Sequence, residues 1–196
     1  MISPREICAS DIMPMDEYAL ARKGRRDKII ALKHSRRVAV GPYAVFNFEC
    51  YQTMWHQIHE MLFIEKGGAA QVDDELNAFN PLIPKGRELV ATVMFEIDDS
   101  LRRHSVLARL GGIEETAFTM FDSYRISGVA DLDVARTNEA GKASSVQFLH
   151  FPFTATQVQA FRTTGMEVVV GFGHKEYSHT VVISEEIRAA LAQDFD

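Results

Sequence analysis

The sequence predicts an α+β protein, in which a helical N-terminal third precedes an antiparallel or mixed β-sheet covered by helices. Three observations support this class. The first third of the chain has mixed helical character. Residues 80–86 then carry two prolines within four positions, which neither a helix nor a central strand tolerates. Beyond them, β-branched apolar runs alternate with helical segments that follow capping residues, so the sheet is expected to come after the helices.

Length and composition fit one compact unit. The chain has 196 residues, of which 46% are hydrophobic and 24% are charged, as in ordinary soluble globular proteins. A chain of this length buries roughly 70% of the surface that its unfolded form exposes, so it needs no metal or disulfide for its stability. We expect a helical region at residues 1–80 and an α+β domain at residues 81–196 that packs against it.

Two helices are expected in the N-terminal region. The first runs over residues 16–34, with Gly24 as a weak point. Residues 38–40 then lead into a Gly-Pro-Tyr turn, where Pro42 is placed to begin or precede the next helix. That second helix is the stretch at residues 48–65, which contains the single tryptophan. Most of this region is therefore expected to be helical.

The C-terminal region consists of expected strands separated by helices. Residues 88–97 predict a strand, and the helix after it begins at Asp98 or Asp99 and ends at Gly111 or Gly112. Further along the chain come residues 116–126, a loop at 138–145, strands at 145–153, 166–173 and 179–183, and helices at 154–165 and, capped by Ser184, at 184–195.

Positive charge is concentrated in residues 18–37. This segment holds eight Lys or Arg residues against one Asp, although the whole chain has a net charge of −6. Such a block suits phosphates, an acidic protein or the chain's own acidic parts. Nucleic acid is disfavoured, because no aromatic residues are interleaved with the basic ones. The segment is either a solvated face or a docking patch for a partner or anion, with Arg22, Arg25, Arg26, Arg36 and Arg37 as its docking residues.

The helix expected at residues 48–65 is amphipathic. Its polar stripe, which spans about 60° at 100° per residue, consists of Glu49, Thr53, His56 and Glu60, flanked by Gln52, Gln57 and His59. His56 and Glu60 are four residues apart on one face, a spacing that lets two side chains reach a single ion or proton. Glu49 lies roughly 10 Å before His56 along the axis, so these two cannot bind one metal unaided.

The spacing of known metal motifs is absent from this stripe. Residues 56–60, HQIHE, match neither HExxH nor its inverted form, and no Glu-x-x-His pair is present. A metal at this helix would therefore need ligands from elsewhere in the chain. The stripe is expected to face solvent or a partner, or to line a pocket.

A second histidine cluster occurs at residues 171–179, between two expected strands. A hairpin connection is the simpler interpretation. Alternatively, His174 and Tyr177 supply a base and a hydroxyl to a shallow site, or His174 joins His56 and Glu60 as the third ligand of a single transition-metal ion. His179 belongs to the same cluster and could complete such a site.

Several functions are not expected. The two cysteines, Cys8 and Cys50, cannot hold an iron–sulfur cluster alone. The chain has no GxSxG elbow and no P-loop, which argues against a classical hydrolase or NTPase. No apolar run is long enough to span a membrane, and the N-terminus lacks the features of a signal peptide, so we expect a cytoplasmic protein. A homodimer is considered on base rates alone.

Several segments, in order, resemble landmarks of the bacterial family catalogued as domain of unknown function 3501. They are DIMP at 11–14, KIIALKHSRRVAVGP at 28–42, FECYQTMWHQIHEML at 48–62, NPLIP at 80–84, SSVQFLHF at 144–151 and GHKEYSH at 173–179. The resemblance covers nearly the whole chain and assigns no activity. It implies a genomic setting beside rubrerythrin-like and iron–sulfur proteins, and hence a role in peroxide defence or electron transfer.

The same resemblance bears on individual residues. It marks Glu49, Gln57, Glu60 and Met61 as characteristic, whereas an aromatic residue is common where this chain has His56, and a basic one where it has His150. The resemblance therefore favours Glu49, Gln57 and Glu60 as polar groups that serve the structure or a partner, and it disfavours His56 as a metal ligand.

Two hypotheses follow. The first is a non-catalytic accessory protein, without a cofactor, that docks on an iron–sulfur or rubrerythrin-like redox partner through the basic segment and the polar stripe. The second is a metal-dependent redox enzyme or sensor whose ion is held by His56, His59 or Glu60 and by His174 or His179. Metal analysis of the purified protein distinguishes the two.

Overall fold

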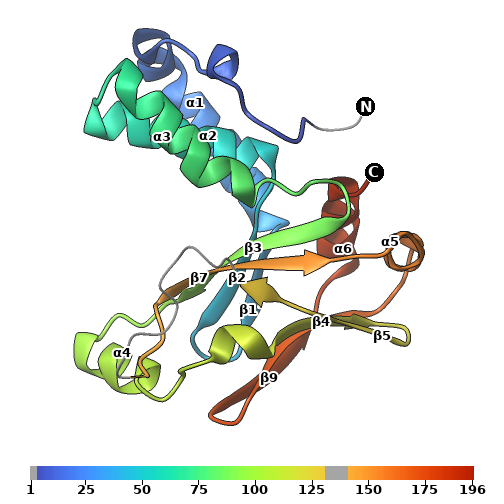
Figure 1. Ribbon diagram of the computed structural model, residues 1–196. Coiled ribbons are helices and arrows are strands. Elements are labelled where there is room, and N and C mark those ends of the chain that lie inside the picture. Colours follow the sequence, from blue (N-terminus) through green and yellow to red (C-terminus); the bar gives the residue numbers. More distant parts are fainter. Residues whose placement is uncertain (1–3, 131–140) are drawn as a thin grey trace.

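The computed structural model describes residues 4–130 and 141–196, which form a helical layer and two antiparallel sheets (Figure 1). The helical layer consists of α1 (Met15–His34), α2 (Tyr51–Glu65) and α3 (Ala69–Phe79). It lies on one side of the first sheet, and the second sheet lies on the other side (Figure 1). The α+β class expected from the sequence is confirmed.

Both sheets are antiparallel throughout. The first has the strand order β1 (Arg37–Val40), β2 (Ala44–Phe48), β3 (Glu88–Phe95), β7 (Val146–Pro152) and β6 (Val129–Ala130). The second has the order β5 (Tyr124–Ser127), β4 (Ala117–Phe121), β8 (Val168–His174) and β9 (Tyr177–Val182). Three neighbouring pairs, β1–β2, β4–β5 and β8–β9, are joined by short turns, as antiparallel pairing allows.

Strand β3 separates two hydrophobic cores. Leu89, Ala91 and Val93 belong to the larger core, which lies between the two sheets and is rich in phenylalanine. Val90 points to the opposite face and packs with Ile58 and other apolar residues of α2. Side chains alternate between the two faces of a strand. The continuous apolar run in β3 therefore reflects a strand that is covered on both faces, by helices and by the second sheet.

The shorter helices begin at residues that cap them. Asp99 accepts a hydrogen bond from the backbone of α4 (Ser100–Leu107), and Thr154 and Ser184 do the same for α5 (Ala155–Arg162) and α6 (Glu185–Leu191). Of the expected caps, Asp98 or Asp99 and Ser184, the structure confirms Asp99 and Ser184. The 3₁₀ turns are η1 (Ala9–Asp11), η2 (Asn80–Leu82), η3 (Ile113–Thr116) and η4 (Ala192–Asp194). Among the described helices, none combines the length and the apolarity that crossing a bilayer requires.

Some boundaries differ from the predictions. Helix α4 ends at Leu107 rather than at the glycines, and Gly112, with φ of 80°, instead precedes η3. The expected helix at 48–65 begins only at Tyr51, because Phe48 is the last residue of β2 and Cys50 is the N-cap. Of the expected loop at 138–145, residues 138–140 lie outside the described residues.

Strand β2 was not foreseen, because a helix was expected to follow Pro42. Phe46 and Phe48 are buried in the core between the sheets, and their rings stack at 6.1 Å. The strand pairs with β1 on one side and with β3 on the other. Long-range pairing and burial thus override the local helix-start signal at this point. The β1–β2 hairpin belongs to the same sheet as strands that follow the proline-rich segment.

Candidate functional site

Two polar residues of α2, His56 and Glu60, face α1. The Tyr18 hydroxyl donates a hydrogen bond to Glu60 Oε1 at 2.7 Å, and the Arg22 guanidinium donates to both oxygens of that carboxylate, at 2.9 and 2.8 Å. Because the hydroxyl hydrogen goes to Glu60, the Tyr18 oxygen accepts from His56 Nδ1, which is 3.2 Å away. Tyr18, Arg22, His56 and Glu60 thus form an α1–α2 polar cluster whose members bind one another.

His59 lies beneath this cluster and has a structural role. Its side chain is fully buried. Nε2 accepts a hydrogen bond from the backbone N–H of Met13 at 3.0 Å, so Nδ1 carries the hydrogen that is donated to the Trp55 carbonyl at 2.6 Å. The indole of Trp55 stacks on the imidazole at 3.6 Å. Burial lowers the pKa of His59, as it does that of His56, which favours neutral rings at pH 7.

Glu49 is not part of the polar stripe. It precedes α2, whose N-cap is Cys50, and it is buried. Its backbone N–H donates to Val90 at 2.8 Å, and its carbonyl accepts from Arg36 Nη1 at 3.4 Å. Gln57 is half-buried on α2. The angular prediction for Glu49 was wrong because α2 begins only at Tyr51, so Glu49 lies between the end of β2 at Phe48 and the N-cap at Cys50.

Glu60 makes the stability of the protein depend on pH. Hydrogen bonds from Arg22 lower the pKa of its carboxyl to about 2. A carboxyl whose pKa is lower in the folded chain contributes stability above its ordinary pKa and loses that contribution as the pH falls toward the lowered value. We expect Glu60→Gln to reduce the free energy of unfolding at pH 7 by about 1–3 kcal/mol and to flatten its decline in acid. Urea unfolding at neutral and acidic pH measures both effects, and parallel pH profiles would contradict this role.

The C-terminal histidines lie elsewhere. Residues 171–179 form the end of the β8–β9 hairpin, so the hairpin interpretation is confirmed. His174 Nδ1 accepts from the backbone N–H of Glu176 at 3.2 Å, and His179 packs edge-on against Tyr177. Figure 1 places this hairpin at the far side of the sheets from α2. The structure therefore does not bring His174 to His56 and Glu60.

This separation bears on the hypothesis of a metal site. Within residues 4–130 and 141–196, no group of three or more His, Cys, Asp or Glu side chains is placed to hold a metal ion. His56 and Glu60 do lie together, but Glu60 accepts hydrogen bonds from Arg22 at both carboxylate oxygens. The two side chains at helical spacing thus serve the packing of α1 on α2.

The basic segment contains cations that form ion pairs within the chain and cations that form none among the described residues. Arg22 pairs with Glu60, Arg36 with Asp194, and Arg37 with Glu96. Among the described residues, no ion pair with a carboxylate is formed by the other five cations, which are Lys23, Arg25, Arg26, Lys28 and Lys33. Of the five arginines predicted to dock a partner, Arg25 and Arg26 thus remain without an internal carboxylate partner.

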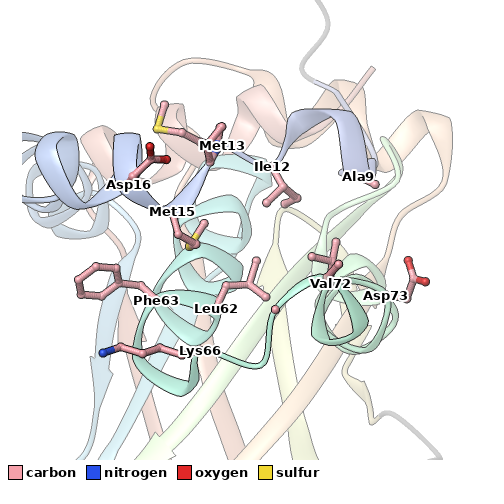
Figure 2. A pocket seen from close by; sticks show the side chains of 13 residues that line it. Ala9, Ile12, Met13, Met15, Asp16, Leu62, Phe63, Lys66, Val72 and Asp73 are labelled. Atoms are coloured by element: carbon pink, nitrogen blue, oxygen red, sulfur yellow. The ribbon is translucent and has the colours of Figure 1, made fainter.

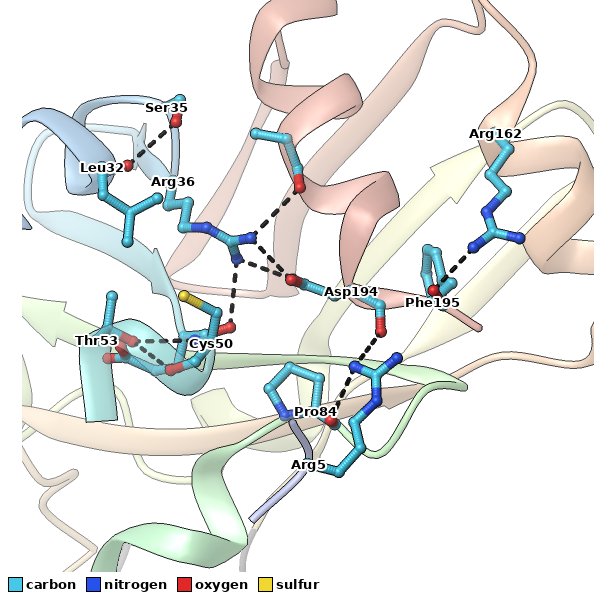
Figure 3. A network of polar contacts seen from close by, with 12 residues as sticks. Arg5, Leu32, Ser35, Arg36, Cys50, Thr53, Pro84, Arg162, Asp194 and Phe195 are labelled. Atoms are coloured by element: carbon cyan, nitrogen blue, oxygen red, sulfur yellow. Dashed lines mark hydrogen bonds and ion pairs between the residues drawn. The ribbon is translucent and has the colours of Figure 1, made fainter. Parts of the chain in front are cut away.

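Arg36 was predicted as a docking residue, but the structure buries it. Its side chain is only 6% exposed, and it binds Asp194 through two hydrogen bonds of 2.8 and 2.7 Å (Figure 3). It also donates to the carbonyls of Glu49 and Ala190. Arg36 therefore joins the start of β1 to the C-terminal end of the chain and is unavailable to a partner.

A cleft lies between α1 and the first half of α2. It encloses about 400 Å³ and is lined by Arg25, Lys28, Ile29, Tyr51, Gln52, Trp55 and His56. The guanidinium of Arg25 lies over the Trp55 ring, 4.4 Å from its centre, a favourable cation–π distance. Arg25 Nε is buried without a hydrogen-bond partner among the described residues. Positive charge and aromatic surface thus meet in one cleft, which we call the cationic–aromatic cleft.

A larger cavity of about 790 Å³ opens at the other end of α2 (Figure 2). Its walls come from the segment before α1, the first residues of α1, the end of α2 and the start of α3. They are mostly apolar, with Ile12, Met13, Leu62, Phe63 and Val72 among the lining residues. Its charged residues are Asp16, Lys66 and Asp73, which belong to three separate elements. This cavity has room for a ligand, but its charged residues are of both signs.

The sequence alone did not identify the aromatic part of the cationic–aromatic cleft. Tyr51 and Trp55 are not among the residues of the predicted polar stripe, but both are half-buried and line the cleft. Tyr18 was also missed, although it is fully buried and holds the α1–α2 polar cluster together. A large polar aromatic residue in the first turn of a charged helix was the available signal.

Comparisons with known proteins agree with this architecture. The family model described as Protein of unknown function (DUF3501) matches residues 6–195. The curated proteins yield no match. A crystal structure of a novel protein of unknown function from Burkholderia pseudomallei K96243 is 33% identical in sequence and has a TM-score of 0.90, over 97% of this chain and 99% of that chain. The chain belongs to the family of proteins of unknown function DUF3501.

Proposed function

We propose that this protein is a non-catalytic accessory protein that binds an acidic partner protein at the cationic–aromatic cleft. The observation that supports this most directly is the position of Arg25 and Lys28. Both line the cleft, and neither forms an ion pair within the described residues. In a chain with a net charge of −6, cations without carboxylate partners add little to stability. Carboxylates of a partner protein would form ion pairs with them.

The cleft also has the chemistry to bury an apolar side chain. Ile29, Tyr51 and Trp55 give it hydrophobic walls, and about 400 Å³ lies within the range of volumes that small ligand sites occupy. Aromatic and arginine residues are enriched where protein partners bind most tightly. We therefore expect an acidic segment whose carboxylates meet Arg25 and Lys28 while a neighbouring apolar side chain enters the cleft.

The polar cluster next to the cleft supports a binding role over catalysis. Both carboxylate oxygens of Glu60 accept hydrogen bonds from Arg22, and the hydroxyl of Tyr18 is bonded to Glu60. Hydrogen bonding to Arg22 also lowers the pKa of Glu60 to about 2, which makes it a poor base at neutral pH. These groups hold α1 on α2 and thereby shape the cleft.

We further propose that the partner belongs to a redox system. The support for this step is the family resemblance, which implies rubrerythrin-like and iron–sulfur proteins as genomic neighbours. An acidic surface on such a partner would suit the free cations of α1. The binding is expected to weaken as salt is added, because exposed charges are screened.

A charge reversal at the cleft tests the proposal. We expect Arg25→Glu with Lys28→Glu to raise the dissociation constant for the rubrerythrin-like or iron–sulfur partner at least about tenfold, because two attractive contacts become repulsive. Isothermal titration calorimetry at low and high salt measures the affinity and its salt dependence. The wild-type affinity should fall with salt, and that of the variant should respond less.

A matched control is a second double reversal with the same change in net charge. Arg87→Glu with Arg109→Glu alters two exposed arginines outside the cleft. We expect this control to bind within about threefold of the wild type. Equal losses in both double variants would show that only net charge matters and would refute the cleft. Unchanged binding in the cleft variant would refute it as well.

A further inference from the structure

The outward face of α1 carries a regular stripe of exposed residues. Its members are separated alternately by four and three positions, the spacing of a coiled-coil seam, and they are Asp16, Leu20, Lys23, Asp27, Ile30 and His34. Leu20 is 90% exposed and Ile30 is 59% exposed. Nothing lies within 4 Å of where a Cβ of Gly24 would be, so there is open space beside the middle of the stripe. Two large apolar side chains of a 20-residue helix are thus exposed to solvent along this stripe, which we call the seam.

This stripe is not the face by which α1 packs on the protein. Tyr18 and Arg22 contact Glu60 of α2, and Arg25 lies over Trp55. At 100° per residue, these three side chains lie on the side of the helix opposite Leu20 and Asp27. The seam therefore points away from the molecule, while the cationic–aromatic cleft lies on the inner side.

The seam is complementary to itself when reversed. In sequence order it contains an acid, an apolar residue, a base, an acid, an apolar residue and a base. If a second α1 runs antiparallel, with residue 25 of one copy opposite residue 25 of the other, Asp16 faces His34. In the same register Leu20 faces Ile30, and Lys23 faces Asp27. In each of these pairs an acidic residue faces a basic one or an apolar residue faces another, and the two-fold symmetry generates every pair twice.

Parallel pairing lacks this property. In parallel register each residue would face its own copy, so Asp16 would meet Asp16, Lys23 would meet Lys23 and Asp27 would meet Asp27. Like charges directly opposite are unfavourable across an interface. The charge pattern thus selects the antiparallel arrangement, which is also the one that a two-fold axis perpendicular to the helix generates.

We propose that the protein forms a homodimer through antiparallel pairing of α1 from two copies. Each copy contributes the same seam, so the interface is isologous and closes at two subunits. The helix is about 30 Å long, which gives an interface smaller than those of most permanent dimers. A dimer that dissociates at concentrations on the order of micromolar is therefore expected. The inference stands independently of the proposed function, because both clefts stay open in the dimer.

Removing the apolar contact tests the interface. Leu20→Asp is expected to raise the dimer dissociation constant at least about 100-fold, since each of its two copies loses a buried leucine and gains a charge. Sedimentation equilibrium over a range of concentrations gives this constant. Leu101→Asp is the control, because Leu101 is 81% exposed on α4 and lies outside the seam. A monomeric wild type at about 100 μM, or equal effects of the two variants, would overturn the proposal.

Charge exchange tests the register. Lys23→Asp alone places four carboxylates at the centre of the interface, and Asp27→Lys alone places four ammonium groups there. We expect each single variant to dimerise at least about tenfold more weakly, and the double variant to return within about threefold of the wild type. Urea unfolding of each variant verifies that the subunit itself stays folded. A folded double variant that remains as weak as the single ones would overturn the antiparallel register.

Discussion

Asp194→Asn is expected to lower the free energy of unfolding by about 3–5 kcal/mol, because it leaves the charge of Arg36 buried without its partner. The two side chains are 6% and 7% exposed, and their two hydrogen bonds measure 2.8 and 2.7 Å. Burial raises the pKa of the Asp194 carboxyl, and the Arg36 guanidinium opposes that rise. Each charge is therefore tolerated in the interior only in the presence of the other. Urea unfolding at pH 7 measures the loss.

A neighbouring carboxylate provides the control for this experiment. Asp196 forms an ion pair with Arg5, but its side chain is 53% exposed. Asp196→Asn should cost less than about 1 kcal/mol, as for other solvent-accessible pairs. The variant with Arg36→Met and Asp194→Leu should be more stable than Asp194→Asn, because it removes both buried charges. Similar stabilities for Asp194→Asn and Asp196→Asn would show that burial of the pair is not what matters.

Tyr177→Phe is expected to lower the free energy of unfolding by about 2–4 kcal/mol, because one hydroxyl satisfies three buried backbone groups. It accepts hydrogen bonds from the N–H groups of Tyr43 and Ala44, at 3.0 and 2.9 Å, and donates to the carbonyl of Val40 at 2.7 Å. These groups form the β1–β2 turn, so Tyr177 ties the end of one sheet to the other. Chemical denaturation gives the loss of stability.

Tyr43→Phe is the matched control for Tyr177. Among the described residues, the hydroxyl of Tyr43 accepts a hydrogen bond only from the exposed guanidinium of Arg102. Water can replace that bond, so the variant should lose less than about 1 kcal/mol. Equal stabilities of the two tyrosine variants would show that the hydroxyl of Tyr177 has no part in holding the sheets together.

The same turn explains why a glycine occupies position 41. Gly41 has a φ of 65°, a left-handed conformation that favours glycine. A Cβ at this position would also lie 2.6 Å from the ring of His179. Tyr177 was a candidate for a shallow site and His179 a candidate for completing a metal site, whereas in the structure both lie against the β1–β2 turn. Their polar character was visible in the sequence, but their neighbours, more than 130 positions away, were not.

The predictions were most accurate where the controlling interactions are local. The caps at Asp99, Thr154 and Ser184 each bond a residue three positions ahead, so the sequence contains both partners. The helix at 16–34 was also predicted within one residue, since it has acidic residues in its first turn and basic ones in its last, as the helix dipole favours. Strand β2 was missed because its strand character depends on pairing with β3, more than 40 positions later.

By itself, the sequence determined the α+β class, the starts of the capped helices, the amphipathic character of α2 and the concentration of cations near residues 18–37. Only the tertiary structure decided which of those cations are available. Arg25 and Arg36 are equivalent by composition and charge, yet one lines an open cleft and the other binds Asp194, 158 positions away. The physical reason is that burial and ion pairing depend on groups brought together by the fold, whereas periodicity and capping depend on neighbours along the chain.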